Sequence, residues 1–256
     1  MDDHLDDAAS WVDRYLDRIG VDRPNETNIE ALTTLMQAHL STVPFENLDV
    51  FARRGVHTDL EHSLSKIVDR RRGGWCFELN GAFAWLLTQL GFPVKRLGAA
   101  VLLDGPSDMV DHLTLEVTLE QPYLVDVGFG ESFLQPLVLN MTGPQSGGND
   151  AFEFIPSPKG TTLLRHTDVG PEPQYRFKRV TLQLSDFDPA SKYLQETDGL
   201  QWTEKPFATR LVDGGPERLT LLRDRLKRDN GSEVSETPVS ESEWPQILKE
   251  HFGMTP

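Results

Sequence analysis

The stretch Arg71-Arg72-Gly73-Gly74-Trp75-Cys76-Phe77-Glu78-Leu79-Asn80 contains the single cysteine of this 256-residue chain. The two glycines before Trp75 allow a tight turn and the close approach of another molecule. From Cys76 onward the apolar residues recur with helical spacing, and the pattern ends at Gly91 and Pro93, which are typical stop signals. We therefore predict an amphipathic helix that begins at or just before Cys76. Its apolar stripe consists of Leu79, Phe83, Leu86, Leu87 and Leu90.

Two roles are compatible with a cysteine at the start of a helix. The N-terminus of a helix carries a partial positive charge that favours a thiolate, and its free N–H groups can stabilise an oxyanion. A lone cysteine is also often a small buried apolar residue without chemistry. The Gly73-Gly74 turn strengthens the first interpretation and leaves the second open.

The residues before this segment have mainly helical patterns. A helix is predicted over residues 28–40, where apolar residues recur at helical spacing. Asn28 can cap its start, and Val43-Pro44 ends it. We therefore expect residues 1–92 to form a helical unit that carries Cys76.

After Val94 the pattern changes to the two-residue period of β-strands. Short alternating strands of this kind favour an antiparallel sheet or a small barrel, which we place at residues 93–195. Residues 140–172 are rich in glycine, proline, serine and asparagine, so we expect them to be mostly loop. The predicted strands are residues 94–103, 112–119, 122–129 and 174–184.

Residues 196–256 form a third unit in the sequence pattern. Asp229-Asn230-Gly231 is a strong hairpin signal, and we predict that it connects residues 218–228 with residues 233–239. Residues 244–252 are then predicted to form a short terminal helix.

Strand register places His112 and Asp126 together. Asp126 is an acid within an apolar run, and a tight connection near Glu120 makes its strand a hairpin partner of the strand that begins at His112. Paired residues of a hairpin have a constant number sum, and sums of 238 or 240 put His112 and Asp126 on one face within about 5–8 Å. A carboxylate in an apolar strand is costly unless it is paired. The pair suits an Asp that orients a His beside a thiol nucleophile, and a purely structural hydrogen bond fits the spacing equally.

Composition and charge exclude several classes of protein. A hydrophobic fraction of 38% and a charged fraction of 25% are typical of a globular chain. The net charge of −15 disfavours nucleic acid as a partner. One cysteine excludes an internal disulfide and a cysteine-based zinc cluster, and we expect no metal site. The chain has no apolar run of the ~20 residues that span a bilayer and begins without a secretory signal, so we expect a cytoplasmic protein without membrane attachment.

Four blocks of the sequence resemble the arylamine N-acetyltransferases. They occur in the order and spacing of that family, with a strong likeness over residues 40–135 and a weak one after about residue 190. The blocks are Val43-Pro44-Phe45-Glu46-Asn47-Leu48, Arg72-Gly73-Gly74-Trp75-Cys76-Phe77-Glu78-Leu79-Asn80, Asp111-His112 and Val125-Asp126-Val127-Gly128-Phe129-Gly130.

The resemblance implies an α+β, cysteine-protease-like fold, with an N-terminal helical bundle, a central antiparallel β-barrel and a C-terminal α/β lid. It also implies that Cys76, His112 and Asp126 form a catalytic triad. The implied reaction is ping-pong, in which acetyl-CoA acetylates Cys76 and an arylamine or arylhydrazine then accepts the acetyl group. The sequence does not indicate an oligomeric state or a preferred amine.

Further motif residues are candidates for substrate contact or support. The hydrophobic pocket of the family maps in part onto Phe45 and Phe129, and Trp75 offers another apolar face, although each ring is equally compatible with a place in the core. We interpret Glu46 and Arg72 as structural support of the site. For the phosphates of acetyl-CoA, no residue is assigned firmly; the nearby basic candidates are Arg70, Arg71, Lys95 and Arg96.

Three other functions are compatible with the same residues. Amide synthases that close macrolactams resemble this family and keep the triad, but use a long polyketide thioester in place of acetyl-CoA. Cysteine peptidases use a Cys-His-Asp set on a related architecture. A binding module for aromatic amines or CoA would keep the pocket without turnover.

Overall fold

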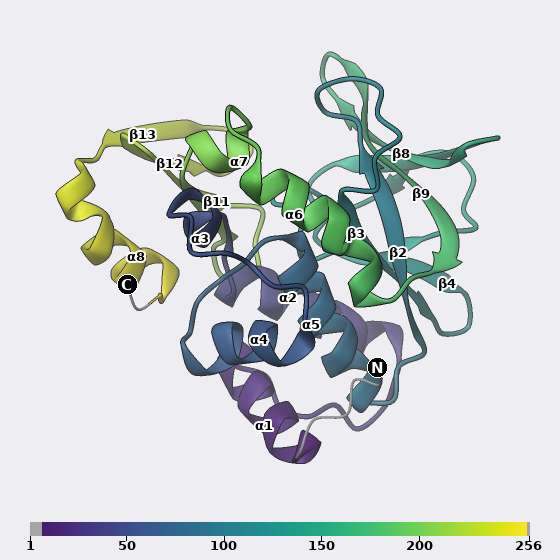
Figure 1. The fold of residues 1–256 in the computed structure, drawn as a ribbon. Coiled ribbons are helices and arrows are strands. Elements are labelled where there is room, and N and C mark those ends of the chain that lie inside the picture. Colours follow the sequence, from purple (N-terminus) through teal and green to yellow (C-terminus); the bar gives the residue numbers. More distant parts are fainter. Residues whose placement is uncertain (1–6, 255–256) are drawn as a thin grey trace.

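The computed structural model describes residues 7–254, and Figure 1 shows helices packed beside a large antiparallel sheet. The first six residues, which include those inspected for a secretory signal, lie outside the described residues. Within residues 7–254, no helix is both long and apolar enough to cross a membrane. The helices are α1 (Ala8–Ile19), α2 (Ile29–Thr42), α3 (Leu48–Phe51), α4 (Leu60–Leu64) with its π-helical continuation η1 (Ser65–Asp69), α5 (Cys76–Gln89), η2 (Leu184–Phe187), α6 (Asp188–Glu196), α7 (Gln201–Glu204), η3 (Glu241–Glu243) and α8 (Trp244–Phe252).

An antiparallel sheet of eight strands forms the nearly closed barrel that the sequence predicts. Its strand order is β5-β4-β3-β2-β9-β8-β7-β6, so β2 and β9 pair although they are far apart in the chain. The expected α+β fold is therefore confirmed. The strands are β2 (Val94–Val101), β3 (His112–Thr118), β4 (Pro122–Val125), β5 (Leu137–Val138), β6 (Gln145–Ser146), β7 (Ala151–Ser157), β8 (Gly160–Thr167) and β9 (Gly170–Thr181).

The loop prediction for residues 140–172 is wrong. Most of this region belongs to β6, β7, β8 and the start of β9, which begins at Gly170 rather than at Gln174. Gly160 and Gly170 follow the turns that precede β8 and β9. Their φ angles are 135° and 128°, which glycine adopts without strain. The glycines of the region thus mark tight turns between strands, not a long loop.

A second sheet of five strands has the order β1-β10-β11-β12-β13. The predicted hairpin around Asp229-Asn230-Gly231 is present between β12 and β13. The single strand predicted over residues 218–228 is wrong, because a turn at Arg223 divides it into two paired strands. The strands of this sheet are β1 (Phe45–Glu46), β10 (Phe207–Leu211), β11 (Arg218–Leu222), β12 (Arg225–Asp229) and β13 (Val234–Pro238).

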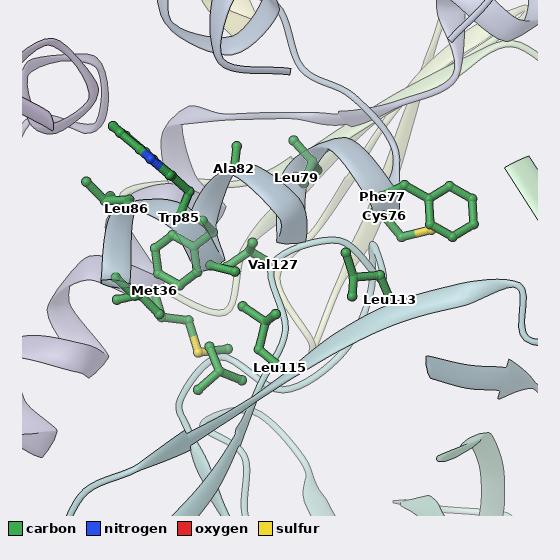
Figure 2. Close-up of a cluster of buried hydrophobic side chains, with 14 of the residues drawn as sticks. Met36, Cys76, Phe77, Leu79, Ala82, Trp85, Leu86, Leu113, Leu115 and Val127 are labelled. Carbon is green, nitrogen blue, oxygen red and sulfur yellow. The ribbon is translucent and has the colours of Figure 1, made fainter. Parts of the chain in front are cut away.

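Helix α5 begins at Cys76, as predicted, but it is buried on all sides rather than along one stripe. Every residue from Cys76 to Leu87 is buried. Figure 2 shows Leu113 and Leu115 of β3 beside α5, together with Met36 of α2. The apolar stripe is in the core as expected, and residues outside the stripe such as Trp85 are buried as well. The helix was predicted to bury one face, whereas α5 is buried on all sides and is the central helix of the fold.

A cluster of charged side chains is buried behind the start of α5. Lys66 Nζ lies 2.9 Å from Glu78 Oε1, 2.9 Å from Asp49 Oδ2 and 4.0 Å from Glu46 Oε1. Burial alone would lower the pKa of Lys66, but these three carboxylates outweigh it and raise the pKa. Arg72 adds a second cation, with one terminal guanidinium nitrogen 2.8 Å from Glu46 Oε1. The cluster holds the segments before and after the Gly73-Gly74-Trp75 turn in one place.

We expect Lys66→Met to lower the free energy of unfolding by about 3–5 kcal/mol, because removal of one buried partner leaves the carboxylates uncompensated. Lys95→Met is the matched control. Lys95 is half exposed, and its partner Glu116 keeps a second cation, Arg179, so its loss should cost about 1 kcal/mol or less. Urea denaturation of both variants gives the comparison. Equal losses in the two variants would contradict the importance of the buried cluster.

Candidate active site

Cys76 is the first residue of α5, and its side chain lies at the junction of α5 with the barrel. The residue is 7% exposed, and its Sγ lies 3.9 Å from the carbonyl oxygen of Asp111. The close approach that the glycines before Cys76 permit is to another part of the same chain. A Cβ at Gly73 would lie 2.0 Å from the Pro44 carbonyl oxygen, so only glycine lets the strand beginning at Phe45 approach the loop.

His112 and Asp126 meet as the strand register predicts. The β3–β4 pairs have a constant sum of 240, as in Leu115 with Val125, which places His112 and Asp126 diagonally on one face. His112 Nε2 lies 2.7 Å from Asp126 Oδ2, and both residues are 2% exposed. The predicted strand over residues 122–129 ends at Val125, so Asp126 itself follows β4.

The Asp126 carboxylate has four polar partners. Its Oδ1 accepts hydrogen bonds from Asn80 Nδ2 at 2.8 Å and from the Gly128 N–H at 3.0 Å. Its Oδ2 accepts from the Tyr175 hydroxyl at 3.0 Å, besides its contact with His112. A buried carboxylate is costly unless it is paired and hydrogen-bonded, and here both oxygens are satisfied.

The sequence analysis missed Asn80 and Tyr175 as site residues. Asn80 lies one helical turn after Cys76, a spacing that brings both to one face of the helix. Its side-chain amide also donates to the Leu113 carbonyl oxygen at 2.6 Å and accepts from the Val127 N–H at 2.9 Å. The four-residue spacing from Cys76 could therefore have indicated Asn80 as a residue of the site. Tyr175 gave no such signal, because it reaches Asp126 only through the long-range pairing of β9 with β2.

The charges of the site favour a protonated imidazole. Burial alone would lower the pKa of His112, but the Asp126 carboxylate and the Cys76 side chain outweigh it and raise the pKa to about 10. Burial would raise the pKa of Asp126, but His112 and the hydrogen bonds outweigh it and lower the pKa. Because the pKa of His112 is above its ordinary 6.5, its contribution to stability is full below pH 6.5 and is lost as the pH rises through about 10.

The three aromatic candidates lie at different depths. The Phe129 ring packs edge-on against His112, with the ring centroids 5.0 Å apart, and it is partly exposed. The Phe45 ring lies against Phe207 at 5.4 Å, and a Cβ at Gly130 would be 3.1 Å from it. Trp75 is 1% exposed and belongs to the core. Phe129 is thus the aromatic candidate in direct contact with the histidine.

The expected pair of Glu46 with Arg72 is present and belongs to the buried charge cluster. Glu46 also accepts a hydrogen bond from the Leu48 N–H at 2.6 Å, which fixes the turn after β1. Among the basic candidates for phosphate contact, Lys95 is paired with Glu116 and Arg96 bonds to the Leu182 carbonyl oxygen.

Another arginine, Arg218 of β11, lies in the sheet that contains β1. It is 8% exposed, and its guanidinium donates to Thr209 Oγ1 at 3.3 Å. Thr209 in turn pairs with Phe45 across β1 and β10. Within the described residues, no group of three or more His, Cys, Asp or Glu side chains is arranged to hold a metal ion.

This arrangement is suited to nucleophilic acyl transfer. A thiol lies at a helix N-terminus, an imidazole with a raised pKa lies within interaction range of it, and a buried carboxylate orients the imidazole. The free N–H groups of the first turn of α5 are available to a developing oxyanion.

Comparisons with known proteins agree with this chemistry. The family profile described as N-acetyltransferase matches residues 28–255. Arylamine N-acetyltransferase 1 from Bos taurus is 30% identical over 273 residues, covering 95% of this chain and 94% of the relative.

Solved structures are similar over nearly the whole chain. The arylamine N-acetyltransferase from Salmonella typhimurium has a TM-score of 0.91 and 27% identity, covering 98% of this chain and 92% of its own. The Mycobacterium marinum arylamine N-acetyltransferase in complex with CoA has a TM-score of 0.87 and 27% identity, covering 95% and 92%. This chain therefore belongs to the arylamine N-acetyltransferase family of acyltransferases.

Proposed function

We propose that the protein transfers the acetyl group of acetyl-CoA to the nitrogen of an arylamine or arylhydrazine, through a thioester on Cys76. The observation that carries this proposal is the buried contact of His112 with Asp126 beside the thiol. The structure of the M. marinum relative contains CoA, which supports acetyl-CoA as the acetyl donor. The relatives named here are arylamine enzymes, which favours this function over a macrolactam-closing amide synthase.

In the first half-reaction, the Cys76 thiolate attacks the carbonyl carbon of the acetyl thioester. The carbonyl oxygen becomes an oxyanion, which the N–H groups at the start of α5 can stabilise. The intermediate collapses by breaking the bond to the CoA sulfur, and the His112 imidazolium gives its proton to that sulfur. Acetyl-Cys76 and free CoA result. Asp126 holds the ring in the orientation that this proton transfer needs.

In the second half-reaction, the amine nitrogen attacks the carbonyl carbon of acetyl-Cys76. His112, now neutral, takes the proton from that nitrogen as a general base. The carbon–sulfur bond breaks, the thiolate is regenerated, and the proton on His112 restores the starting state. Phe129, which contacts His112, and Phe45 are the proposed faces for the aromatic ring, while Trp75 lies in the core against Trp202, which in turn packs against Phe45.

We propose that Glu46 and Arg72 support the site rather than take part in the chemistry, because their pair fixes the turn after β1. We also propose three units, residues 1–92, 93–195 and 196–256. The supporting observation is that the cysteine comes from the helices, whereas the histidine and aspartate come from the β3–β4 hairpin of the barrel.

The phosphates of the donor are proposed to lie at the junction of the barrel and the five-stranded sheet. A cavity of about 360 Å³ lies there, lined by Arg165, Arg218 and Lys227. Arg165 is paired with Glu131, and Lys227 is paired with Asp229. Arg218 makes no ion pair with any residue in the described range. Burial lowers its pKa only to about 10, so it remains a cation at neutral pH.

The mass of the intact protein tests the covalent step. Mixing with acetyl-CoA alone should add about 42 Da, and an arylhydrazine should then remove it. Cys76 is the single cysteine, so Cys76→Ser, which lacks a thiolate, should show no gain and almost no turnover. Labelling only by longer acyl thioesters would support the amide synthase instead. Peptide cleavage would support a peptidase, and binding of amines without turnover would support a binding module.

The rate of Cys76 alkylation by iodoacetamide at pH 7.5 tests whether Asp126 keeps His112 protonated beside the thiol. In Asp126→Asn, burial lowers the pKa of His112 and only Cys76 opposes it, so the imidazolium that favours the thiolate is lost. We expect alkylation to slow and turnover to fall roughly 10²–10⁴-fold. Tyr175→Phe, which keeps the ring and removes one hydrogen bond to Asp126, should show a smaller effect in the same direction.

The matched control for Asp126→Asn is Glu153→Gln. Glu153 forms a similar carboxylate–histidine contact elsewhere in the barrel, where its Oε2 lies 3.0 Å from His166 Nε2 and both side chains are partly exposed. This variant should alkylate at the wild-type rate. Circular dichroism of each variant separates loss of fold from loss of reactivity. Wild-type alkylation in a folded Asp126→Asn protein would refute the assigned role.

Arg218→Met tests the donor site. Removal of this cation should raise KM for acetyl-CoA roughly tenfold and leave KM for the arylhydrazine unchanged. Arg228→Met is the control, because Arg228 is an exposed arginine on the neighbouring strand that pairs with Glu217. Equal KM changes for both substrates, or the same change in the control, would count against the assignment.

A further inference from the structure

A second cavity, of about 460 Å³, is lined by residues of α3 and α8. It is on the other face of the five-stranded sheet from Cys76. Phe207 of β10 contacts Phe45, whereas the next residue, Ala208, packs in a separate apolar cluster with Leu248 of α8. Because successive side chains of a strand point to opposite faces, β10 separates this cavity from the proposed catalytic site.

The floor of this cavity is apolar. Leu48 and Phe51 of α3 line one side, and Trp244 and Leu248 of α8 line the other. Phe51 and Trp244 are only half buried, so their rings keep surface that a ligand can cover. An apolar surface with aromatic faces favours a ligand with a ring or another bulky apolar body.

Three arginines, Arg54, Arg72 and Arg223, lie around this apolar floor. Arg54 and Arg72 share the carboxylate of Asp49. Arg223 has no carboxylate partner among the described residues, and its guanidinium carbon lies 5.4 Å from the centre of the Phe51 ring. The Nε atom of Arg72 is buried and has no hydrogen-bond partner within the same range. Because the Arg72 Nε atom is buried, Arg223 is the donor at this cavity that a ligand can reach.

The charge of the cavity comes from side chains, because the Trp244 N–H at the start of α8 donates to the Glu241 carbonyl oxygen and Pro245 has no N–H. Glu241 is the single acid among the described lining residues. Arg54 and Arg72 are already paired with Asp49, and Arg72 also with Glu46, so Arg223 is the lining arginine without a carboxylate partner among the described residues.

We propose that this cavity binds a small organic anion that has an aromatic body and one anionic group. The body lies between Phe51 and Trp244. The anionic group accepts hydrogen bonds from the exposed guanidinium of Arg223. This site is separate from the acetyl-transfer site, and its occupancy does not depend on the proposed reaction.

Fluorescence titration with 1-anilinonaphthalene-8-sulfonate tests the proposal, because this probe has an aromatic body and one sulfonate. The protein is first alkylated at Cys76, so that the thiol is blocked. Arg223→Gln should raise the Kd roughly tenfold, and Glu241→Gln, which removes the opposing charge, should lower it. Arg225→Gln is the matched control. Arg225 lies two residues from Arg223 on the same turn, is paired with Asp224, and does not line the cavity.

N-phenyl-1-naphthylamine supplies the same aromatic body without the charge. It should bind more weakly than the sulfonate, and neither Arg223→Gln nor Glu241→Gln should change its Kd by more than about twofold. Equal changes in Kd for the two probes in these variants would contradict the anionic subsite. Failure of the sulfonate to bind, or a Kd that is unchanged in Arg223→Gln, would overturn the proposal.

Discussion

The buried carboxylate of Asp126 is the constraint on which the site depends. It lies in an apolar hairpin where an unpaired charge would cost several kcal/mol, so its four partners must be in place when the chain folds. Those partners come from α5, from β3, from the loop after β4 and from β9. One ion therefore joins the helix that carries the thiol to the barrel that carries the imidazole. The position of Cys76 relative to His112 follows from this joint.

The start of α5 is held from two sides. On one side, Glu78 bonds to Lys66 and accepts from the Trp75 N–H at 3.1 Å. On the other side, Asn80 bonds to Asp126, to the backbone of β3 and to the backbone of the loop after β4. Both residues lie within about one turn of Cys76, so a rigid helix passes each restraint to the thiol. The complete burial of α5 has the same effect, because a central helix has no free face on which to rotate.

The sequence was most informative where the interaction is local. The even number sum predicted that His112 and Asp126 share one face, and the helix start at Cys76 followed from glycine and apolar spacing. The loop prediction failed because composition was given more weight than alternation. Phe152 and Phe154 are buried on either side of the half-exposed Glu153, a two-residue period within the supposed loop. Tyr175 could not be found, since no local pattern shows that β9 pairs with β2.

The resemblance to a family was carried by short blocks, and the structure shows how two of those blocks are joined. Phe45 pairs with Thr209 of β10 and also forms a parallel bridge to Gly74. The two-residue strand β1 therefore joins the five-stranded sheet to the loop that precedes Cys76. Such a close joint excludes a side chain at Gly73, where a Cβ would overlap the Pro44 carbonyl oxygen. The glycines and the block that begins at Val43 thus form one structural unit, and a change in either would shift the thiol away from His112.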